Sequence, residues 1–242
     1  MAQELSSRGW DLITVFALAE GHTEIAFIQQ VLRPHLRMRG IVLQAGRPVK
    51  SGGGVMKWLP TLRDIRGKLL DNTARYVTTR FDLYGLPSDW PGREEARRRQ
   101  LKNEWAVRYV EDALMTAVKK EMDEKFDSRR LIPYIQQNEF ETLLFCHPRI
   151  LAETIGAPKL EGDLERIVHQ CGGCEKIDDN PETAPSKRIV RLAPTYQKRT
   201  DAVIAAMKIG LAAMRERCPH FNAWVGRLEN LVTAQAASPA RP

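Results

Sequence analysis

The chain has 242 residues, of which 43% are hydrophobic, so it is long enough to bury a full core. Its formal net charge is +7 and 25 of its 37 basic residues are arginine, which favours nucleic acid or another polyanion as partner; a solvated basic surface is the alternative. Four irregularly spaced cysteines and short apolar runs exclude a disulfide-stapled scaffold and a membrane-spanning protein. With no signal-peptide pattern at its start, the chain is expected in the cytoplasm.

The first elements predict a buried parallel strand followed by a helix. Residues 12–19 are almost continuously apolar, without alternation, which is typical of a strand covered on both faces. Apolar residues then recur at helical spacing from Thr23 to a stop at Gly40, and Pro34 is expected to kink or break the last turn. Residues 41–44 read as a second short strand.

The next segments continue this alternation. Residues 58–69 carry a helical apolar stripe, and the β-branched and aromatic residues 75–82 predict a third strand. Residues 93–126 predict one long helix or two. A fourth strand follows at 131–137, where a proline indicates an edge position or a strand start, and Asn138 is a good N-cap for another helix.

Alternating strands and helices predict an α/β fold with a mainly parallel sheet flanked by helices. We expect a core over residues 11–147 with a helical insertion at about 93–130, and a helical C-terminal part over 148–232 packed on that core. Residues 1–10 are expected to be a flexible N-terminus, and 233–242 a disordered tail.

Acidic residues follow the ends of three predicted strands. Glu20 follows the first strand, Asp82 ends the third, and Glu139 and Glu141 follow the fourth. In an open α/β sheet the ligand site lies outside the carboxyl ends of the strands, so these side chains are expected to gather at one edge. Gathered carboxylates repel one another unless a cation compensates them. Mg²⁺ or Mn²⁺, as one or two ions, suits such a site and serves phosphodiester cleavage.

Each of these residues also has a structural interpretation. Glu24, in the first turn of the following helix, either joins the site or only favours the helix dipole. Asp82 either binds the ion or caps the following loop. Glu139 and Glu141 are about 200° apart on a helix, so only one of them points at the site. Glu139 is expected if the turn at Asn138 is irregular, and Glu141 if it is regular.

Five motifs in order carry a resemblance to a known family. The stretches "AEGHTE", "TTRFDLYGLP", "PYIQQNEFETLLF", "APSKRI" and "CPHFNAW" resemble one uncharacterised bacterial Toprim-like family over about residues 12–228. That family is related to the Toprim nuclease half of the overcoming-lysogenization-defect (OLD) proteins. Its members are often encoded beside an ATPase of the AAA or SMC type, and a role in phage defence is suspected.

The resemblance assigns roles to individual acids. Glu20 and Glu24 match the two glutamates of the opening Toprim motif, and Asp82 matches the first aspartate of the Toprim acidic pair. The second aspartate of that pair would fall at position 84, where this chain has Tyr84. The sequence therefore departs from the Toprim pattern at one metal ligand.

The resemblance also implies replacements and a basic group. Glu139 or Glu141 is the candidate for the missing ligand. Lys187 resembles the late basic residue that OLD-type nucleases place near the scissile phosphate, and Ser186 and Arg188 are expected to bind phosphate with it. An ordinary basic loop is the alternative.

Together these features predict a Mg²⁺-dependent nuclease of DNA or RNA, with Glu20, Asp82 and Lys187 as catalytic residues. The resemblance implies an ATPase partner, bound through helical surface that carries the aromatic residues Trp105, Tyr109, Phe221 and Trp224. The alternative is a Toprim-derived regulatory or structural subunit that has lost catalysis. Cys171 and Cys174 invite a zinc interpretation, but no second paired spacing supplies the remaining ligands.

Overall fold

The structure, a computed structural model, describes residues 12–49, 57–71, 74–124, 126–177, 180 and 182–236. The expected flexible N-terminus lies outside these residues, as does the end of the expected tail, 237–242. Residues 231–236 form a short helix, α11 (Leu231–Ala236). No helix among the described residues has both the length and the apolar character that a membrane crossing requires.

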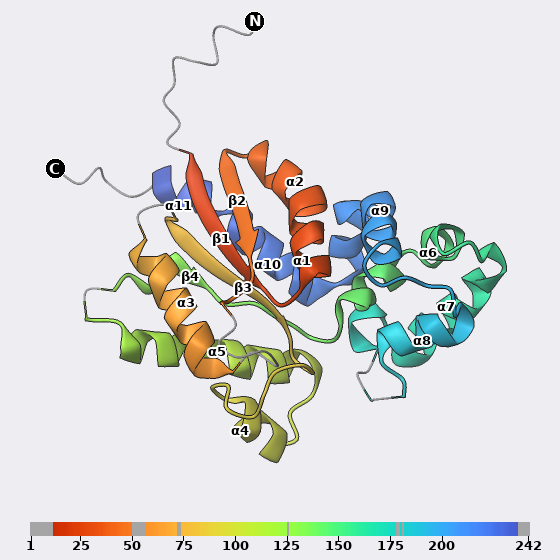
Figure 1. Cartoon of the computed structure of the whole chain (residues 1–242), viewed down its shortest axis with the longest axis horizontal. Helices are drawn as coiled ribbons and strands as arrows, with labels where there is room; N and C mark the ends of the chain where they lie inside the picture. Colours follow the sequence, from red (N-terminus) through yellow and green to blue (C-terminus); the bar gives the residue numbers. More distant parts are fainter. Residues whose placement is uncertain are drawn as a thin grey trace, which may run out of the picture.

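Five strands form the sheet, and every pairing is parallel. They are β1 (Ile13–Ala19), β2 (Ile41–Gly46), β3 (Tyr76–Asp82), β4 (Leu131–Ile132) and β5 (Ile135–Gln136). The order is β2-β1-β3-β4, with β5 also paired to β3. Figure 1 shows this sheet with helices on both sides, so the predicted α/β fold with a mainly parallel, helix-flanked sheet is confirmed.

The predicted fourth strand is interrupted between β4 and β5. Pro133 has no N–H to give to a ladder, and at the next residue a side chain takes over the pairing. The Tyr134 N–H donates to Thr79 Oγ1 at 2.9 Å, and this hydroxyl donates to the Tyr134 carbonyl at 3.0 Å. One threonine thus replaces two ladder bonds and lets the strand resume as β5.

The first helical segment is continuous rather than broken. It runs from α1 (His22–Phe27) through a π-helical turn, η2 (Ile28–Leu32), into α2 (Arg33–Arg37). Pro34 is the second residue of α2 and follows the π-helical turn, where the hydrogen-bond ladder of the helix is already interrupted. The expected break is therefore wrong, because the turn widens ahead of the proline instead. The segment ends at Gly40, whose φ of 78° is left-handed.

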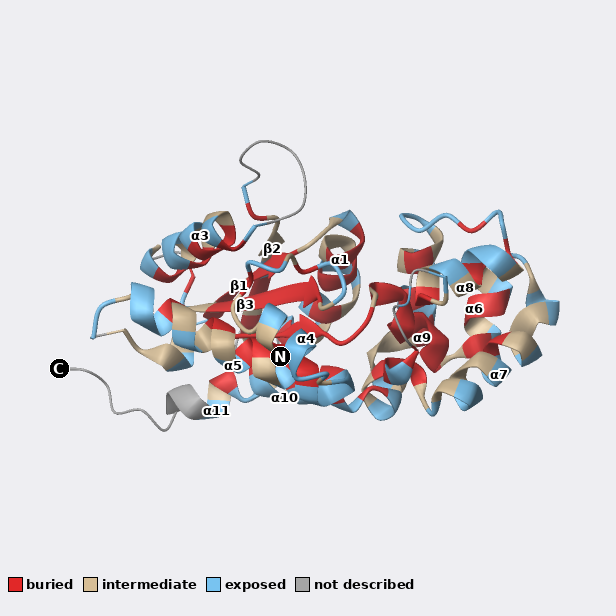
Figure 2. Cartoon of the chain, turned by 90° about the horizontal axis from the view of Figure 1, so that it is seen from below, coloured by how far each residue is buried: buried red, intermediate tan, exposed pale blue. Residues whose placement is uncertain are grey.

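Two apolar layers enclose the sheet. The helices α3 (Trp58–Leu70) and α5 (Asn103–Glu121) pack on one face through the cluster that contains Ile65, Val77 and Leu114. The first helical segment and the C-terminal helices pack on the other face, in a cluster that joins Val15, Phe27, Phe145 and Trp224 among others. Figure 2 shows that buried residues run from the strands into the C-terminal helices, so both parts share a core.

The insertion contains two helices, α4 (Arg93–Arg98) and α5, rather than one. The C-terminal part consists of α6 (Pro148–Thr154), α7 (Glu161–Cys171), α8 (Pro185–Leu192), α9 (Asp201–Arg217), α10 (Pro219–Glu229) and α11. Short 3₁₀ turns connect the elements at η3 (Ser128–Arg130), η4 (Phe140–Cys146), η5 (Pro158–Leu160) and η6 (Cys174–Lys176).

The helix expected after Asn138 is the 3₁₀ helix η4, and Asn138 is not its N-cap. Glu139 holds the N-cap position, while the Asn138 amide donates to the Glu175 carbonyl at 2.7 Å. The turn is thus irregular, because the amide is held by η6 instead of by the helix that follows it.

Candidate functional site

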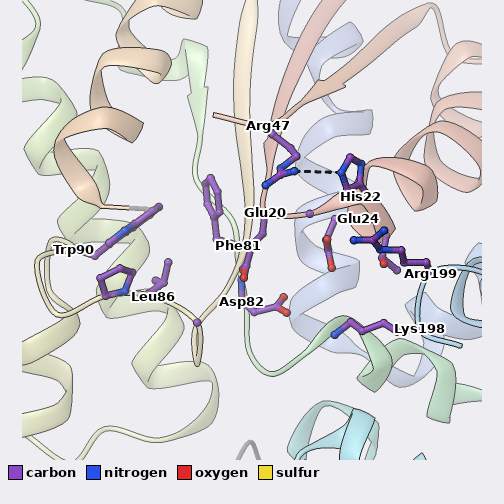
Figure 3. A pocket seen from close by; sticks show the side chains of 14 residues that line it. Glu20, His22, Glu24, Arg47, Phe81, Asp82, Leu86, Trp90, Lys198 and Arg199 are labelled. Atoms are coloured by element: carbon purple, nitrogen blue, oxygen red, sulfur yellow. Dashed lines mark hydrogen bonds between the residues drawn. The ribbon is translucent and has the colours of Figure 1, made fainter. Parts of the chain in front are cut away.

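A pocket of about 700 Å³ lies at the carboxyl ends of β1 and β3. Figure 3 shows Glu20, Glu24 and Asp82 in its centre, with Lys198 and Arg199 on one side and Leu86 and Trp90 on the other. The structure therefore brings together three of the five predicted metal ligands, two from the junction of β1 with α1 and one from the end of β3.

Adjacent parallel strands fix the first two carboxylates. The Glu20 N–H donates to the Arg80 carbonyl at 3.1 Å, which extends the β1–β3 ladder by one residue. In return, the Asp82 N–H donates to Glu20 Oε2 at 3.0 Å. The pairing thus places both acids at the sheet edge; it also holds the Glu20 carboxylate there, whereas the Asp82 carboxylate takes no part in these two bonds.

Two glycines leave room for the glutamate side chains. A Cβ on Gly21 would lie 2.6 Å from Glu24 Oε2, and a Cβ on Gly85 would lie 3.0 Å from Glu20 Oε1. Both distances are shorter than ordinary contacts, so any other residue at Gly21 would displace the Glu24 carboxylate. The "EG" pair of the opening motif is explained by this close approach.

The negative charges of Glu20, Glu24 and Asp82 are only partly offset by the positive charges near them. Burial raises the pKa of Asp82 well above its usual value, and the charges of Glu20 and Glu24 raise it further, against the opposing charges of Arg80 and Lys198. Burial likewise raises the pKa of Glu20, which the hydrogen bond from Asp82 partly offsets. Asp82 Oδ1 is buried without a hydrogen-bond partner in the described part of the chain. A cation bound here would favour the charged forms of Asp82 and Glu20 and would give Asp82 Oδ1 a partner.

Arg80 provides a fixed positive charge beneath the pocket. It is fully buried between two aromatic rings, with its guanidinium carbon 5.4 Å from the centroid of Phe27 and 5.1 Å from that of Phe140. None of its guanidinium nitrogens hydrogen-bonds to a described residue. Its contribution to Glu20 and Asp82 is therefore through charge rather than through a direct bond.

Lys198 links the pocket to a deeper carboxylate. Its Nζ forms an ion pair with Oε2 of the fully buried Glu141 at 3.1 Å. The Tyr196 hydroxyl donates a hydrogen bond of 3.4 Å to Oε1 of the same carboxylate. Burial disfavours the charged form of Lys198, yet the charges of Glu141 and Glu139 raise its pKa overall. Glu141 is thus the counter-ion of Lys198, which leaves it unavailable as a ligand while that pair is intact.

The remaining predicted residues lie outside the pocket. Glu139 Oε2 accepts the Ser186 N–H at 2.8 Å, so Glu139 fixes the start of α8. Lys187 is exposed on α8, and Arg188 donates to the Thr183 carbonyl at 2.6 Å. Tyr84, at the position where the resemblance leads one to expect an aspartate, is about half exposed.

Sequence reasoning missed the basic residues that line the pocket, beginning with Lys198 and Arg199. They lie between α8 and α9, in a segment without helical or strand periodicity. A "KR" pair is common in a chain with 37 basic residues, so these two residue types alone did not indicate a binding site. Arg47, which is 3.2 Å from His22 Nε2 through its Nη1, was missed for the same reason.

The donor set fits a hard divalent cation that keeps part of its water shell. Glu20 and Asp82 offer carboxylate oxygens, as Mg²⁺ and Mn²⁺ prefer, and Asp82 Oδ1 has no competing bond in the described residues. Over those same residues, no three His, Cys, Asp or Glu side chains form a group that could hold a metal. Water or substrate oxygens would therefore complete the coordination.

The cysteines form a different cluster from the one the sequence suggests. Cys174 is buried and hydrogen-bonded to Cys146 and Cys218, whose sulfur atoms lie 3.2 Å apart. Cys171 is only partly exposed and ends α7. The three buried thiols come from η4, η6 and the junction of α9 with α10, and all four cysteines are free.

The aromatic residues expected at a partner surface divide into two groups. Phe221 and Trp224 are buried in the core against Tyr134 and Phe27, so they are structural. Trp105, in contrast, is 76% exposed.

The fold and pocket define an α/β protein with an acidic site at the carboxyl edge of a parallel sheet. A family model described as "Domain of unknown function (DUF4276)" matches residues 19–229, and the chain belongs to this family. No curated protein matches it.

Solved structures with similarity to this chain include C-terminal regions of two OLD proteins. The region from Burkholderia pseudomallei is 15% identical, with 92% of this chain and 98% of that chain covered and a TM-score of 0.44. The region from Xanthomonas campestris pv. campestris, phased with mercury, is 18% identical, with 92% and 97% covered and a TM-score of 0.41.

Proposed function

We propose that this chain is a Toprim-type nuclease that hydrolyses phosphodiester bonds of DNA or RNA with one or two Mg²⁺ or Mn²⁺ ions. One observation carries the proposal: Glu20 and Asp82 lie side by side with raised pKa values, in a pocket that also contains Lys198 and Arg199. Metal-assisted phosphoryl transfer requires carboxylates that hold a metal ion next to positively charged groups that hold a phosphate.

Each residue has a role in this proposal. Glu20 and Asp82 hold the ion, and Glu24 adds negative charge beside them; the ion, when bound, supplies charge stabilisation to the transferring phosphate. Lys198 and Arg199 orient the phosphate from the side of the pocket opposite Leu86 and Trp90. Lys187, exposed on α8, contacts a more distant phosphate together with Ser186 and Arg188.

The test is cleavage of labelled single-stranded and duplex DNA and RNA in the presence of Mg²⁺ or Mn²⁺. Glu20→Gln and Asp82→Asn should each lower the rate by roughly 10³-fold or more, since positioning and charge are most of what the protein supplies. Glu153→Gln is the matched control, because this exposed glutamate on α6 pairs only loosely with Arg149, at 3.9 Å. Cleavage that survives in both site variants would refute the assignment.

The nuclease is further proposed to act in the cytoplasm as the effector of an AAA- or SMC-type ATPase in anti-phage defence. This part rests on the sequence resemblance alone. It is tested by co-expression with the neighbouring ATPase: co-elution that depends on ATP supports the partnership, whereas separate elution with and without ATP at micromolar concentration rejects it.

A second candidate is a regulatory or structural subunit without catalysis. The observation in its favour is Tyr84, which stands where the Toprim pattern has its second aspartate. It predicts that Mg²⁺ does not raise the melting temperature of the wild-type chain, whereas a metal-binding nuclease is stabilised by its ion.

A further inference from the structure

Trp105 is an exposed indole in a protein that buries its other described tryptophans. It is 76% exposed, whereas Trp58, Trp90 and Trp224 are at most 8% exposed. Its neighbours on α5 that face the core, such as Val107, are fully buried, so the exposed position does not follow from a loosely packed helix. An exposed indole offers a large flat surface that a ligand can cover.

Trp105 lines a second groove, of about 670 Å³. One wall consists of residues 100–105, and the other of η6 with the glycines before it and the start of α10. Gln137, which is buried, also lines it. The groove is therefore formed by four segments that are distant in sequence but held together in the fold.

The free charge of this groove is positive. Lys102 and Lys176 are exposed and form no ion pair with any described residue. The two acids of the groove are already engaged. Glu104 pairs with Arg108 at 2.5 Å, and the carboxylate of Glu175 accepts the N–H groups of two residues in α10.

The second groove is connected to the carboxylate pocket through the end of β5. Gln136 stands opposite Asp82 in the β3–β5 register, and Gln137, the next residue, lines the groove. The segment that follows Asp82 contributes Leu86 and Trp90 to the pocket and residues 100–105 to the groove. A single ligand strand that lies along this segment would contact both.

We propose that the second groove binds a single-stranded flank of the nucleic acid that the carboxylate pocket cleaves, with one base stacked on Trp105 and phosphates beside Lys102 and Lys176. This inference rests on the proposed nuclease function and adds to it that the substrate has a single-stranded flank. Stacking on an exposed aromatic ring requires a base that is free of a duplex. A protein partner fits less well, because charged residues are depleted at the centres of protein interfaces and two lysines line the same groove as this indole.

The test measures binding by the full chain in EDTA, so that no metal-dependent cleavage takes place. Labelled strands of about 15 nucleotides, as DNA and as RNA, are compared with the matching duplex by fluorescence anisotropy at about 0.1 M salt. Trp105→Ala should weaken single-strand binding about tenfold, and duplex binding less than about twofold. Trp105→Phe should restore most of the loss, because a phenyl ring still stacks.

Two controls separate stacking from charge and from folding. Leu70→Ala removes another exposed apolar side chain, at the end of α3, and should leave both affinities unchanged. Lys102→Ala and Lys176→Ala should each lower the slope of log K against log salt by roughly 0.7 for single strands. Unchanged melting temperatures show that all variants fold.

The outcomes distinguish this inference from the proposed function. Single-strand binding that depends on Trp105, without cleavage in Mg²⁺, supports the groove while the nuclease proposal fails. Trp105→Ala binding like the wild type, or losing single strands and duplex equally, overturns the groove. Loss of a co-eluting protein partner in Trp105→Ala, with nucleic-acid binding intact, assigns the indole to a protein interface and also overturns it.

Discussion

Asp82 and Glu175 are buried to a similar degree, at 8% and 6% exposure, but their surroundings differ in kind. Both oxygens of Glu175 accept backbone N–H groups at the start of α10, from His220 at 3.0 Å and Phe221 at 2.8 Å. Asp82 Oδ1 has no partner among the described residues, and Asp82 faces two more acids. A buried carboxylate with every bond made is structural, whereas one left without partners beside like charges indicates a missing ligand.

The largest expected change in stability follows from removing the carboxylate of Glu175, both of whose oxygens accept hydrogen bonds. Glu175→Ala leaves two buried N–H groups of α10 without acceptors, so the free energy of unfolding should fall by about 3 kcal/mol. Glu175→Gln keeps one acceptor oxygen and should lose about half as much. Urea denaturation measures both, and an Ala variant as stable as the wild type would contradict the structural role.

Lys198→Met should produce the next largest change. It leaves the fully buried Glu141 without its cation, which is strongly destabilising for a buried pair; because Lys198 is itself 46% exposed, we expect about 2 kcal/mol. Adding Glu141→Gln to this variant should recover most of the loss. A double variant no more stable than the single one would show that the pair is not the cause.

Asp82→Asn tests the second carboxylate of the comparison, whose Oδ1 has no hydrogen-bond partner among the described residues. Since the folded state raises the pKa of Asp82, its charge opposes folding at neutral pH, and the variant should be as stable as the wild type or more so without metal. The wild type should gain about 1.4 kcal/mol at a Mg²⁺ concentration tenfold above its Kd, and the variant should gain nothing. Thermal melts with and without Mg²⁺ measure this, and a variant that unfolds would withdraw the metal assignment.

The smallest effect is expected from the pH dependence of His220. Burial opposes its charge, but Glu111, whose Oε1 is 3.1 Å from Nε2, raises its pKa overall. A raised folded-state pKa gives stability that is complete below the unfolded value near 6.5 and is lost as pH rises through the folded value. The unfolding free energy should therefore decline slightly above about pH 6.5, and His220→Gln should lack this step.

The sequence was sufficient for the sheet and for the central acids because both depend on local patterns. An apolar run ends just before Glu20 and a β-branched and aromatic run ends at Asp82, and parallel strands place such ends at one edge. Lys198 could not be predicted, because its position depends on how a non-periodic segment crosses the sheet edge. Glu141 is of a residue type that commonly binds metal ions, and only its distance to Lys198 shows that it is an ion-pair partner instead.

Long-range contacts set a second limit. The partners of Cys174 are Cys146 and Cys218, and the latter two are 72 residues apart, so the "CGGC" spacing pointed to the wrong neighbour. Likewise, the strand break at Pro133 depends on a hydroxyl of β3, which no pattern within residues 131–137 reveals.

The unequal burial of the four cysteines gives this protein a built-in attachment point for a probe. Three thiols are buried, and only Cys171 is partly open to solvent, so a maleimide dye should attach there first. The two residues that follow it, Gly172 and Gly173, line the groove beside Trp105. A dye on the native chain would thus lie next to that groove and report, through its emission, when the groove is filled.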